Sequence, residues 1–434
     1  MLKSTLPLSF IVATRFFGLF IILPVFSVYA KNLDGANTFL IGIAIGIYAL
    51  MQMVFQLPFG LMSDKFGRKN SILIGLIIFI VGSLVCALSS DIYTMIFGRL
   101  LQGCGAVGAV AIAMISDFVK EELRAKAMAI MGAMIGFGFT ISLVISPVLA
   151  RFFGLSSLFY LSALLTVFCI ILLYTVVPAE PKISSIEKKS NIATLLKDRD
   201  LFLMNMTNFL QKMIMTIAFL AIPLILVNKM NYNIDKLWIV YSIAMCFGFV
   251  AMSFVGMFGE RGGLAKAILL FGIVLFVIAY LLFALSSSKL FFIVGVTIFF
   301  VGFSMHEPIL QSSVSKFAKA TQKGVVLGIF NGVGYFGSFC GGLIGGFFMH
   351  NYGIGWLSLF VIIMAFPWFY KLIFLTNPSL LKSFVYKKEK LDLTKLHNIK
   401  GFIESYKTGE SYVIRYNSSL VTKEQLEEAL RDER

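Results

Sequence analysis

The chain has 434 residues, of which 59% are apolar and 14% are charged, and its mean hydropathy is +0.90. A soluble domain is about half apolar, so this composition excludes an ordinary soluble protein. A formal net charge of +15 suggests nucleic acid at first, but the charged residues form short clusters between long apolar runs. We therefore expect a membrane protein with no nucleic-acid partner.

Twelve apolar runs of about 20 residues follow one another, each long enough to cross a hydrocarbon core of roughly 30 Å. In chain order they are 6–30, 38–61, 71–90, 92–116, 126–150, 156–177, 200–228, 237–258, 265–286, 289–314, 324–349 and 352–375. The sequence predicts an all-α membrane protein with twelve transmembrane helices in two pseudo-symmetric six-helix bundles.

Lysine and arginine are distributed unevenly between the predicted loops. With the N-terminus inside, the inner loops hold seventeen of these residues and the outer loops hold five, namely Lys31, Arg151, Lys229, Lys236 and Lys289. Cytoplasmic loops of membrane proteins carry the excess of cations. The pattern predicts a multi-pass protein of the cell inner membrane with both termini in the cytoplasm.

An internal repeat supports the two bundles. Residues 60–67 and 256–263 share the pattern Gly-x-x-x-acid-base-x-Gly at a displacement of 256 − 60 = 196 residues. A repeat of about half the chain implies two homologous bundles around a central site. We assign 1–178 to the N-terminal bundle, 179–199 to a cytoplasmic linker and 200–376 to the C-terminal bundle.

After the twelfth run the composition changes to charged and alternating segments. Short strands are expected at 383–388, 402–406 and 411–416, and residues 422–425 match a capping box in front of a helix with Leu426 and Leu430 on its apolar face. Residues 377–434 thus predict a small cytoplasmic α+β domain. Because fewer than 60 residues form only a modest core, this tail is expected to lean on the membrane domain or on a second copy of itself.

The loop between the second and third runs reads GLMSDKFGRK at 60–69 and closely resembles the signature of the major facilitator superfamily. Residues of the fourth run resemble a second signature, that of the family's proton-driven antiporters: Arg99, Gln102, Gly103, Gly105 and Ala106. Asp117 and Arg124 match at the next turn. Together with the tail, the chain looks like a drug:proton antiporter of the YajR-type subgroup, whose C-terminal domain is ferredoxin-like.

The signature loop is interpreted as a conformational latch. Glycines permit positive φ and close approach, and a carboxylate at the membrane boundary can pair with the start of another helix or with Arg68. The predicted latch residues are Gly60, Asp64, Gly67 and Arg68, with Asp117 and Arg124 added by the resemblance. Rigid-body rocking needs a contact that is made in one state only. The alternative is that these charges merely fix topology.

Charges inside the runs are few, and each costs at least about 2.5–3.5 kcal/mol at mid-membrane. Glu307 is the clearly intramembrane acid, so it is the candidate proton carrier. The alternative is a permanent salt bridge with Arg15 or Lys212. His306, next to Glu307, is a further candidate, and Arg99 receives a coupling role only through the resemblance.

Polar residues at helical spacing predict the lining of a substrate cavity. They are Arg15, Gln52, Asn208, Lys212, Gln311, Asn331 and Tyr335. Such stripes line a wet path or join helices by hydrogen bonds, and for the weaker ones the two interpretations stay open. For Lys212 and Glu307 the cavity is favoured.

We therefore expect a secondary active transporter that works by alternating access and couples proton entry to efflux of small lipophilic or cationic compounds. Alternatives are a proton-coupled uptake symporter and a membrane sensor that signals through the tail. The chain departs from the family at Arg15, where many drug:proton antiporters carry an acid, and at Ser146-Pro147. We expect no enzyme activity, no metal and no cofactor: without a phosphate-binding loop the proton gradient is the expected driving force. The expected form is a monomer in the lipid bilayer, with possible self-association of the tail.

Overall fold

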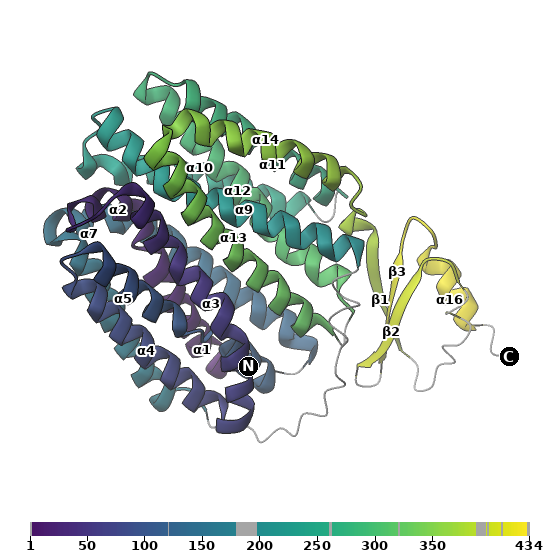
Figure 1. Ribbon diagram of the computed structural model, residues 1–434. Helices are drawn as coiled ribbons and strands as arrows, with labels where there is room; N and C mark the ends of the chain where they lie inside the picture. Colours follow the sequence, from purple (N-terminus) through teal and green to yellow (C-terminus); the bar gives the residue numbers. More distant parts are fainter. Residues whose placement is uncertain are drawn as a thin grey trace.

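The computed structural model shows two groups of long helices side by side, with a small sheet domain attached at one end (Figure 1). The structure describes residues 2–119, 121–178, 198–259, 263–319, 322–387, 396, 399–408 and 411–431. The N-terminal half consists of α1 (Leu2–Phe20), α2 (Leu23–Tyr29), α3 (Thr38–Phe66), α4 (Arg68–Leu88), α5 (Ile92–Cys104), α6 (Gly108–Phe118) and α7 (Glu121–Thr175).

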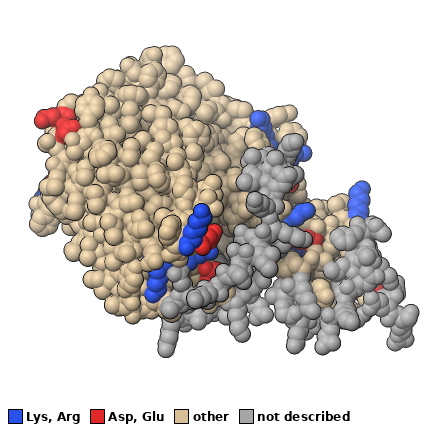
Figure 2. Space-filling view, turned by 60° about the horizontal axis from the view of Figure 1, so that its bottom comes forward, with Lys and Arg blue, Asp and Glu red and all other residues tan. Residues whose placement is uncertain are grey.

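The C-terminal half follows the same plan. It consists of α9 (Arg199–Leu224) with a π-helical turn Ile225–Lys229, then α10 (Leu237–Phe258), α11 (Ala265–Leu285), α12 (Lys289–Phe317), α13 (Lys323–Asn351) and α14 (Gly353–Ile373). In Figure 2 a wide surface without charged side chains separates acidic residues at one edge from basic and acidic residues near the tail. Such a surface suits contact with lipid.

Eleven helices of the described chain are long and apolar enough to cross a membrane. One of them, α7, has 55 residues, about 80 Å, and is too long for one crossing. Gly154 divides it with φ 75° and ψ 175°, a conformation that glycine adopts without strain. The two arms of α7 match the predicted runs 126–150 and 156–177, so the prediction of twelve membrane helices is confirmed.

Two predicted runs are not continuous helices, which corrects the sequence-based boundaries. The first run is divided between α1 and α2, where Pro24 in the first turn of α2 lacks the N–H that would reach the Phe20 carbonyl. The fourth run is divided at Gly105, between α5 and α6. A Cβ on Gly105 would lie 2.3 Å from the carbonyl oxygen of Gly75, so α4 crowds the chain at this point.

Asp91 starts the helical part of the fourth run. Its side chain accepts hydrogen bonds from the backbone N–H groups of Tyr93 and Thr94, both at 2.9 Å, and caps α5. The Thr94 hydroxyl and these N–H groups hold the pKa of the Asp91 carboxyl below its usual value, because they bind the ionised form. The N-cap therefore fixes where α5 begins.

Glycines bring α3 and α13 into backbone contact across the two halves. A Cβ added at Gly42 would lie 2.2 Å from the carbonyl oxygen of Gly342, and one added at Gly46 would lie 2.9 Å from that of Phe339. Small residues permit this approach of helices in a membrane. The contact closes the end of the bundle that carries residues 30–37 and 351–353, which we call the closed end.

The same two helices separate toward the opposite end. A Cβ at Gly332 would lie 3.8 Å from Met53, and at Gly328 or Gly324 it would meet no atom within 4 Å. On α3, Leu57 is 70% exposed. The two halves thus diverge toward the end where α3 passes into α4 at Gly67, which we call the open end.

The tail forms an antiparallel sheet in the order β1-β3-β2, with β1 (Leu381–Lys387), β2 (Phe402–Thr408) and β3 (Ser411–Asn417), followed by α16 (Lys423–Arg431). Leu426 and Leu430 pack on its core. The capping box is confirmed, since the Thr422 N–H donates to Gln425 Oε1 at 3.0 Å and the Gln425 N–H donates to Thr422 Oγ1 at 3.3 Å.

The described contacts of the tail join it to the C-terminal half. Arg415 of β3 donates to the carbonyl groups of Lys316 and Ala318, at 2.8 Å for Ala318, and forms an ion pair with Glu404. The Asn377 amide donates to the Gly263 carbonyl at 2.8 Å. A cation on the last carbonyl groups of α12 is favourable for the helix dipole. The tail thus sits at the open end, on the helix that carries Glu307.

Candidate transport site

A salt bridge between two helices of the C-terminal half lies in the middle of the membrane domain. Lys212 Nζ of α9 is 2.8 Å from Glu307 Oε2 of α12, and Gln211 Nε2 donates to the same oxygen at 3.3 Å. The Lys212 and Glu307 side chains are 22% and 34% exposed. Of the two interpretations from the sequence, the structure shows the ion pair with Lys212, at a place that solvent reaches.

This pair lowers the cost of two charges at membrane depth. An ion alone would be expensive there, and removing either partner would leave the other uncompensated. Protonation of Glu307 would break the pair by neutralising the carboxylate, and it would leave the Lys212 ammonium group without its counter-ion.

Four aromatic rings from both halves close the space above the pair on the side of the closed end. The Phe139 ring of α7 lies 4.6 Å from Phe20 of α1, 6.4 Å from Phe219 of α9 and 6.1 Å from Phe303 of α12, measured between centroids. Phe139, Phe219 and Phe303 are each less than a tenth exposed. We call these four residues the aromatic layer.

Below the aromatic layer the seam between the halves is open. One helical turn before Phe139, a Cβ added at Gly136 would meet no atom within 4 Å, and the same holds for Gly132. The glycine contacts of α3 and α13 show the same change from contact to open space along the helices. The Lys212–Glu307 pair thus lies on the open-end side of the aromatic layer.

Two buried arginines in the N-terminal half have neutral partners. Arg15 donates to the carbonyl of Gly105 and lies 4.2 Å from the centroid of Phe79. Arg99 donates to Gln102 Oε1 at 2.7 Å and to the Ala44 carbonyl at 3.3 Å. Arg99 is thus in α5 beside α3, and the structure does not bring it to Glu307.

The break in the fourth run explains two of the predicted cavity residues. Where α5 ends, the carbonyl groups of Gly103 and Gly105 lose their helical partners. Gln52 donates to the first at 3.0 Å, and Arg15 donates to the second. Irregular backbone at membrane depth is tolerated when side chains satisfy it. Gln52 and Arg15 are buried here and support the helix break, and their role in the cavity lining stays a prediction.

Asn208 also joins helices. It is buried, and its amide donates to the Phe330 carbonyl of α13 at 2.7 Å, so its role in the cavity lining stays a prediction as well. Gln311 is exposed near the open end, and Asn331 and Tyr335 are partly buried on α13. Lys212 and these three residues keep the predicted cavity role.

His306 is turned away from Glu307, which corrects its place among the coupling residues. It is fully buried, with Nε2 2.7 Å from the Leu269 carbonyl of α11, and its ring packs edge-on against Phe276 and Trp368. Successive residues of a helix point about 100° apart, so a neighbour of Glu307 faces different helices. His306 therefore packs α12 against α11 and α14.

The predicted latch residues come together at the open end, apart from Arg124, whose side chain lies outside the described residues. Arg68 contacts Asp64 at 2.6 Å and Asp117 at 3.2 Å, so the cluster joins α3, α4 and α6. Gly67 has φ 90°, as expected of a glycine between two helices, and the space around Gly60 is open. All these contacts lie within the N-terminal half, and the latch role stays a prediction.

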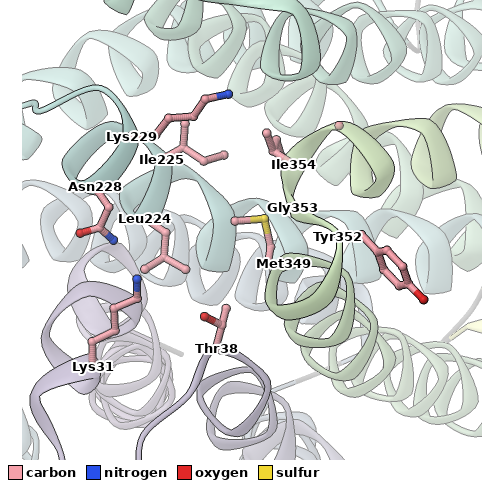
Figure 3. A pocket seen from close by; sticks show the side chains of 11 residues that line it. Lys31, Thr38, Leu224, Ile225, Asn228, Lys229, Met349, Tyr352, Gly353 and Ile354 are labelled. Carbon is pink, nitrogen blue, oxygen red and sulfur yellow. The ribbon is translucent and has the colours of Figure 1, made fainter.

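A pocket of about 600 Å³ lies at the closed end. Lys31 and Thr38 line it from the N-terminal half, and Asn228, Lys229 and Tyr352 line it from the C-terminal half. Figure 3 shows these side chains around a space between the two halves. The aromatic layer and the α3–α13 contact lie between this pocket and the Lys212–Glu307 pair.

The aromatic layer was not predicted from the sequence, because phenylalanines of a membrane protein mostly face lipid. One signal was available: Phe303 precedes Glu307 by four residues, so the two share a helix face. No periodicity in the sequence indicated that Phe139 of α7 would meet Phe303 from the other half.

The profile of the Major Facilitator Superfamily matches residues 8–341 and 254–416. Together with two six-helix halves around a mid-membrane site, this match shows that the chain belongs to the major facilitator superfamily of membrane transporters. The family and fold predicted from the sequence are confirmed, and so is the prediction that the protein is a transporter and no enzyme.

Individual members of the family show which transporters the chain is similar to. The chain is 35% identical over 349 residues to the inner membrane transport protein YajR of Escherichia coli (strain K12), covering 79% of this chain and 77% of the relative. It is 36% identical over 158 residues to the class B tetracycline resistance protein of Escherichia coli, covering 35% of this chain and 38% of that protein. The crystal structure of a D-xylose-proton symporter superposes with a TM-score of 0.70 at 14% identity, covering 86% of this chain and 98% of that one.

Proposed function

We propose that the protein exports small lipophilic compounds across the cell inner membrane in exchange for protons. The single observation that carries the proposal is the partly exposed Lys212–Glu307 pair, at 2.8 Å, on the open-end side of the aromatic layer. The sequence likeness to a tetracycline resistance protein supports an export role over part of the chain. Charge distribution in the loops supports a cytoplasmic position for the open end and both termini.

The proposed cycle follows from the two states of Glu307. Ionised, it holds Lys212 on α12, and the open end admits substrate from the cytoplasm. Protonated, it releases Lys212, and the pair no longer ties α9 to α12. Alternating access then needs the halves to rock about the central site. The proton gradient supplies the driving force, without a cofactor or ATP.

A second candidate is uptake of an organic anion together with a proton. The observation that favours it is Lys212 itself, because protonation of Glu307 leaves an ammonium group without its carboxylate. A substrate carboxylate would then bind best when the proton is bound, which gives symport. In the export proposal, substrate and proton exclude one another.

The test is a flux assay in proteoliposomes with a pH-sensitive dye inside. Tetracycline, tetraphenylphosphonium and an aromatic carboxylate serve as probes, with and without a pH gradient. For the wild type we expect a probe to move against a proton flux, and Glu307→Gln should lose the gradient-driven component while retaining downhill exchange. Probe and proton moving together would support symport, and gradient-driven transport by Glu307→Gln equal to wild type would overturn the coupling role.

A further inference from the structure

We propose that Phe303 and Phe139 form a gate across the seam and that Phe303 positions Lys212, so that the state of Glu307 controls the gate. This inference rests on the proposed proton coupling. It assigns a task to two phenylalanines that neither the family signatures nor the charge pattern identified.

The first support is the arrangement of Lys212 between two partners on α12. Phe303 and Glu307 are four residues apart and share one face of the helix. Lys212 Nζ lies 2.8 Å from Glu307 Oε2 and 5.2 Å from the centroid of the Phe303 ring. An ammonium group within about 6 Å of a ring is attracted to its face. One cation is thus shared by a carboxylate and an aromatic ring.

The second support is that Phe303 is part of the seam. Its ring packs on Phe139 of the N-terminal half at 6.1 Å, and Phe139 also contacts Phe20 and Phe219. Open space begins one turn below, at Gly136. For the closed end to open, the aromatic layer must separate, and the contact of Phe139 with Phe303 must break.

These two contacts make a mechanical link. While Glu307 is ionised, the carboxylate fixes Lys212, and the ammonium group in turn holds the Phe303 ring. When Glu307 is protonated, the ammonium group loses its carboxylate partner. Movement of Lys212 toward another partner then removes a contact that keeps Phe303 against Phe139. Protonation of Glu307 thereby weakens the contact between Phe303 and Phe139 that closes the gate.

Other ionisable groups around Glu307 are few. From α11, the Tyr280 hydroxyl donates to the Ile214 carbonyl at 3.0 Å, and His306 of α12 faces α11 and α14. From α10, the Tyr241 hydroxyl donates to the Pro24 carbonyl at 3.4 Å. The sequences of α10 and α13 carry no Asp, Glu, Lys or Arg apart from Lys323 at the start of α13. Within the described helices, Lys212 is therefore the cation that pairs with Glu307.

The test reads gate opening without a substrate. In full-length protein carrying Thr38→Cys, the maleimide labelling rate of that position is followed by mass spectrometry of its peptide, from about pH 5 to pH 9. Thr38 is partly buried in the pocket at the closed end, so its labelling rate should rise when the two halves separate there. A matched proton-leak assay in empty proteoliposomes reports the seal.

Phe303→Leu keeps apolar bulk and removes the ring. Lys212 then loses its contact with the ring, which weakens the ionised state of Glu307 more than the protonated state, because that contact is made while the carboxylate fixes Lys212. We expect the midpoint of the pH profile to rise, by about half a unit for a contact of typical strength. Phe303→Tyr should restore the midpoint, because it restores a ring. Phe139→Ala should raise proton leak several-fold with the midpoint unchanged.

Phe336→Leu is the control, since Phe336 is 41% exposed and contacts Phe209; it should leave both readouts unchanged. A Phe303→Leu profile identical to wild type, or a Phe139→Ala protein that stays tight, overturns the gate. If Phe303→Leu fails to fold, Phe303→Met and Phe303→Trp give the same comparison of bulk with ring. If labelling loses all pH dependence in Glu307→Gln but its midpoint is unshifted in Phe303→Leu, the gate alone is contradicted. If labelling keeps its pH dependence in Glu307→Gln, the proposed function is contradicted.

Discussion

Gln52 shows how a polar side chain at membrane depth can hydrogen-bond a backbone carbonyl group that has no helical partner. It is buried on α3 and donates to the Gly103 carbonyl, which the break between α5 and α6 leaves without a helical partner. An unpaired carbonyl in the interior costs about as much as a lost hydrogen bond. Arg15 does the same for Gly105, through its guanidinium group.

Gln52→Leu should destabilise the protein by about 1–3 kcal/mol, because the substitution keeps volume and leaves the Gly103 carbonyl unsatisfied. The readout is the unfolding temperature in detergent. Gln56→Leu, on the same helix and half-buried, serves as the control and should change the temperature little. An unchanged unfolding temperature for Gln52→Leu would show that the hydrogen bond does not support the break.

At the scale of elements, the contact between α3 and α13 sets which end of the bundle is closed. Gly42→Ala places a Cβ 2.2 Å from the Gly342 carbonyl and 2.9 Å from the Gly346 Cα, where only backbone can move aside. The substitution should therefore favour opening of the closed end and speed labelling at Thr38→Cys several-fold. Gly355→Ala, with no atom within 4 Å, is the control. Equal labelling of both variants would contradict the closing role.

The cluster at the open end gives a second prediction at this scale. Asp64→Asn removes the 2.6 Å contact with Arg68 and leaves the contact with Asp117. Because the Asp64 side chain is 55% exposed, the pair contributes little to stability. We expect transport to fall at least several-fold with unchanged membrane insertion and unfolding temperature. Normal transport by Asp64→Asn would reduce the cluster to a determinant of topology.

Helices and their caps were easier to predict from the sequence than the contacts between residues of different helices. Apolar length gave twelve crossings, and Thr422 and Gln425 gave the capping box, because both signals are local in the chain. The break at Gly105 was not predictable, since it depends on the Gly75 carbonyl of a neighbouring helix. For His306, helical spacing already indicates a side chain about 100° away from Glu307, whereas its packing on Phe276 and Trp368 depends on other helices.

For the whole molecule, two halves that meet at one end and separate at the other explain why the site is reached from one side. The described contacts of the tail join it to the C-terminal half, through Arg415 at the end of α12 and Asn377 at the Gly263 carbonyl. The tail can therefore move together with the C-terminal half when the halves rock, because these contacts do not connect it to the N-terminal half.

Deletion of residues 377–434 should leave substrate flux within about two-fold of the full chain, because the Lys212–Glu307 pair and the aromatic layer lie in the membrane domain. The comparison is the initial rate in proteoliposomes at equal protein content. A folded membrane domain without flux would contradict a separate transport unit and favour the sensor alternative.

The central claim is that Glu307 gives up a proton when substrate binds. Its most direct measurement uses purified protein in weakly buffered detergent solution with a pH-indicator dye, at a pH below the midpoint of the labelling profile so that Glu307 starts protonated, to which a probe that the protein transports is added. The wild type should release up to one proton per transporter, and the release should vanish in Glu307→Gln. Equal proton release by Glu307→Gln and wild type, or proton uptake by the wild type, would contradict exchange of substrate for a proton at this residue.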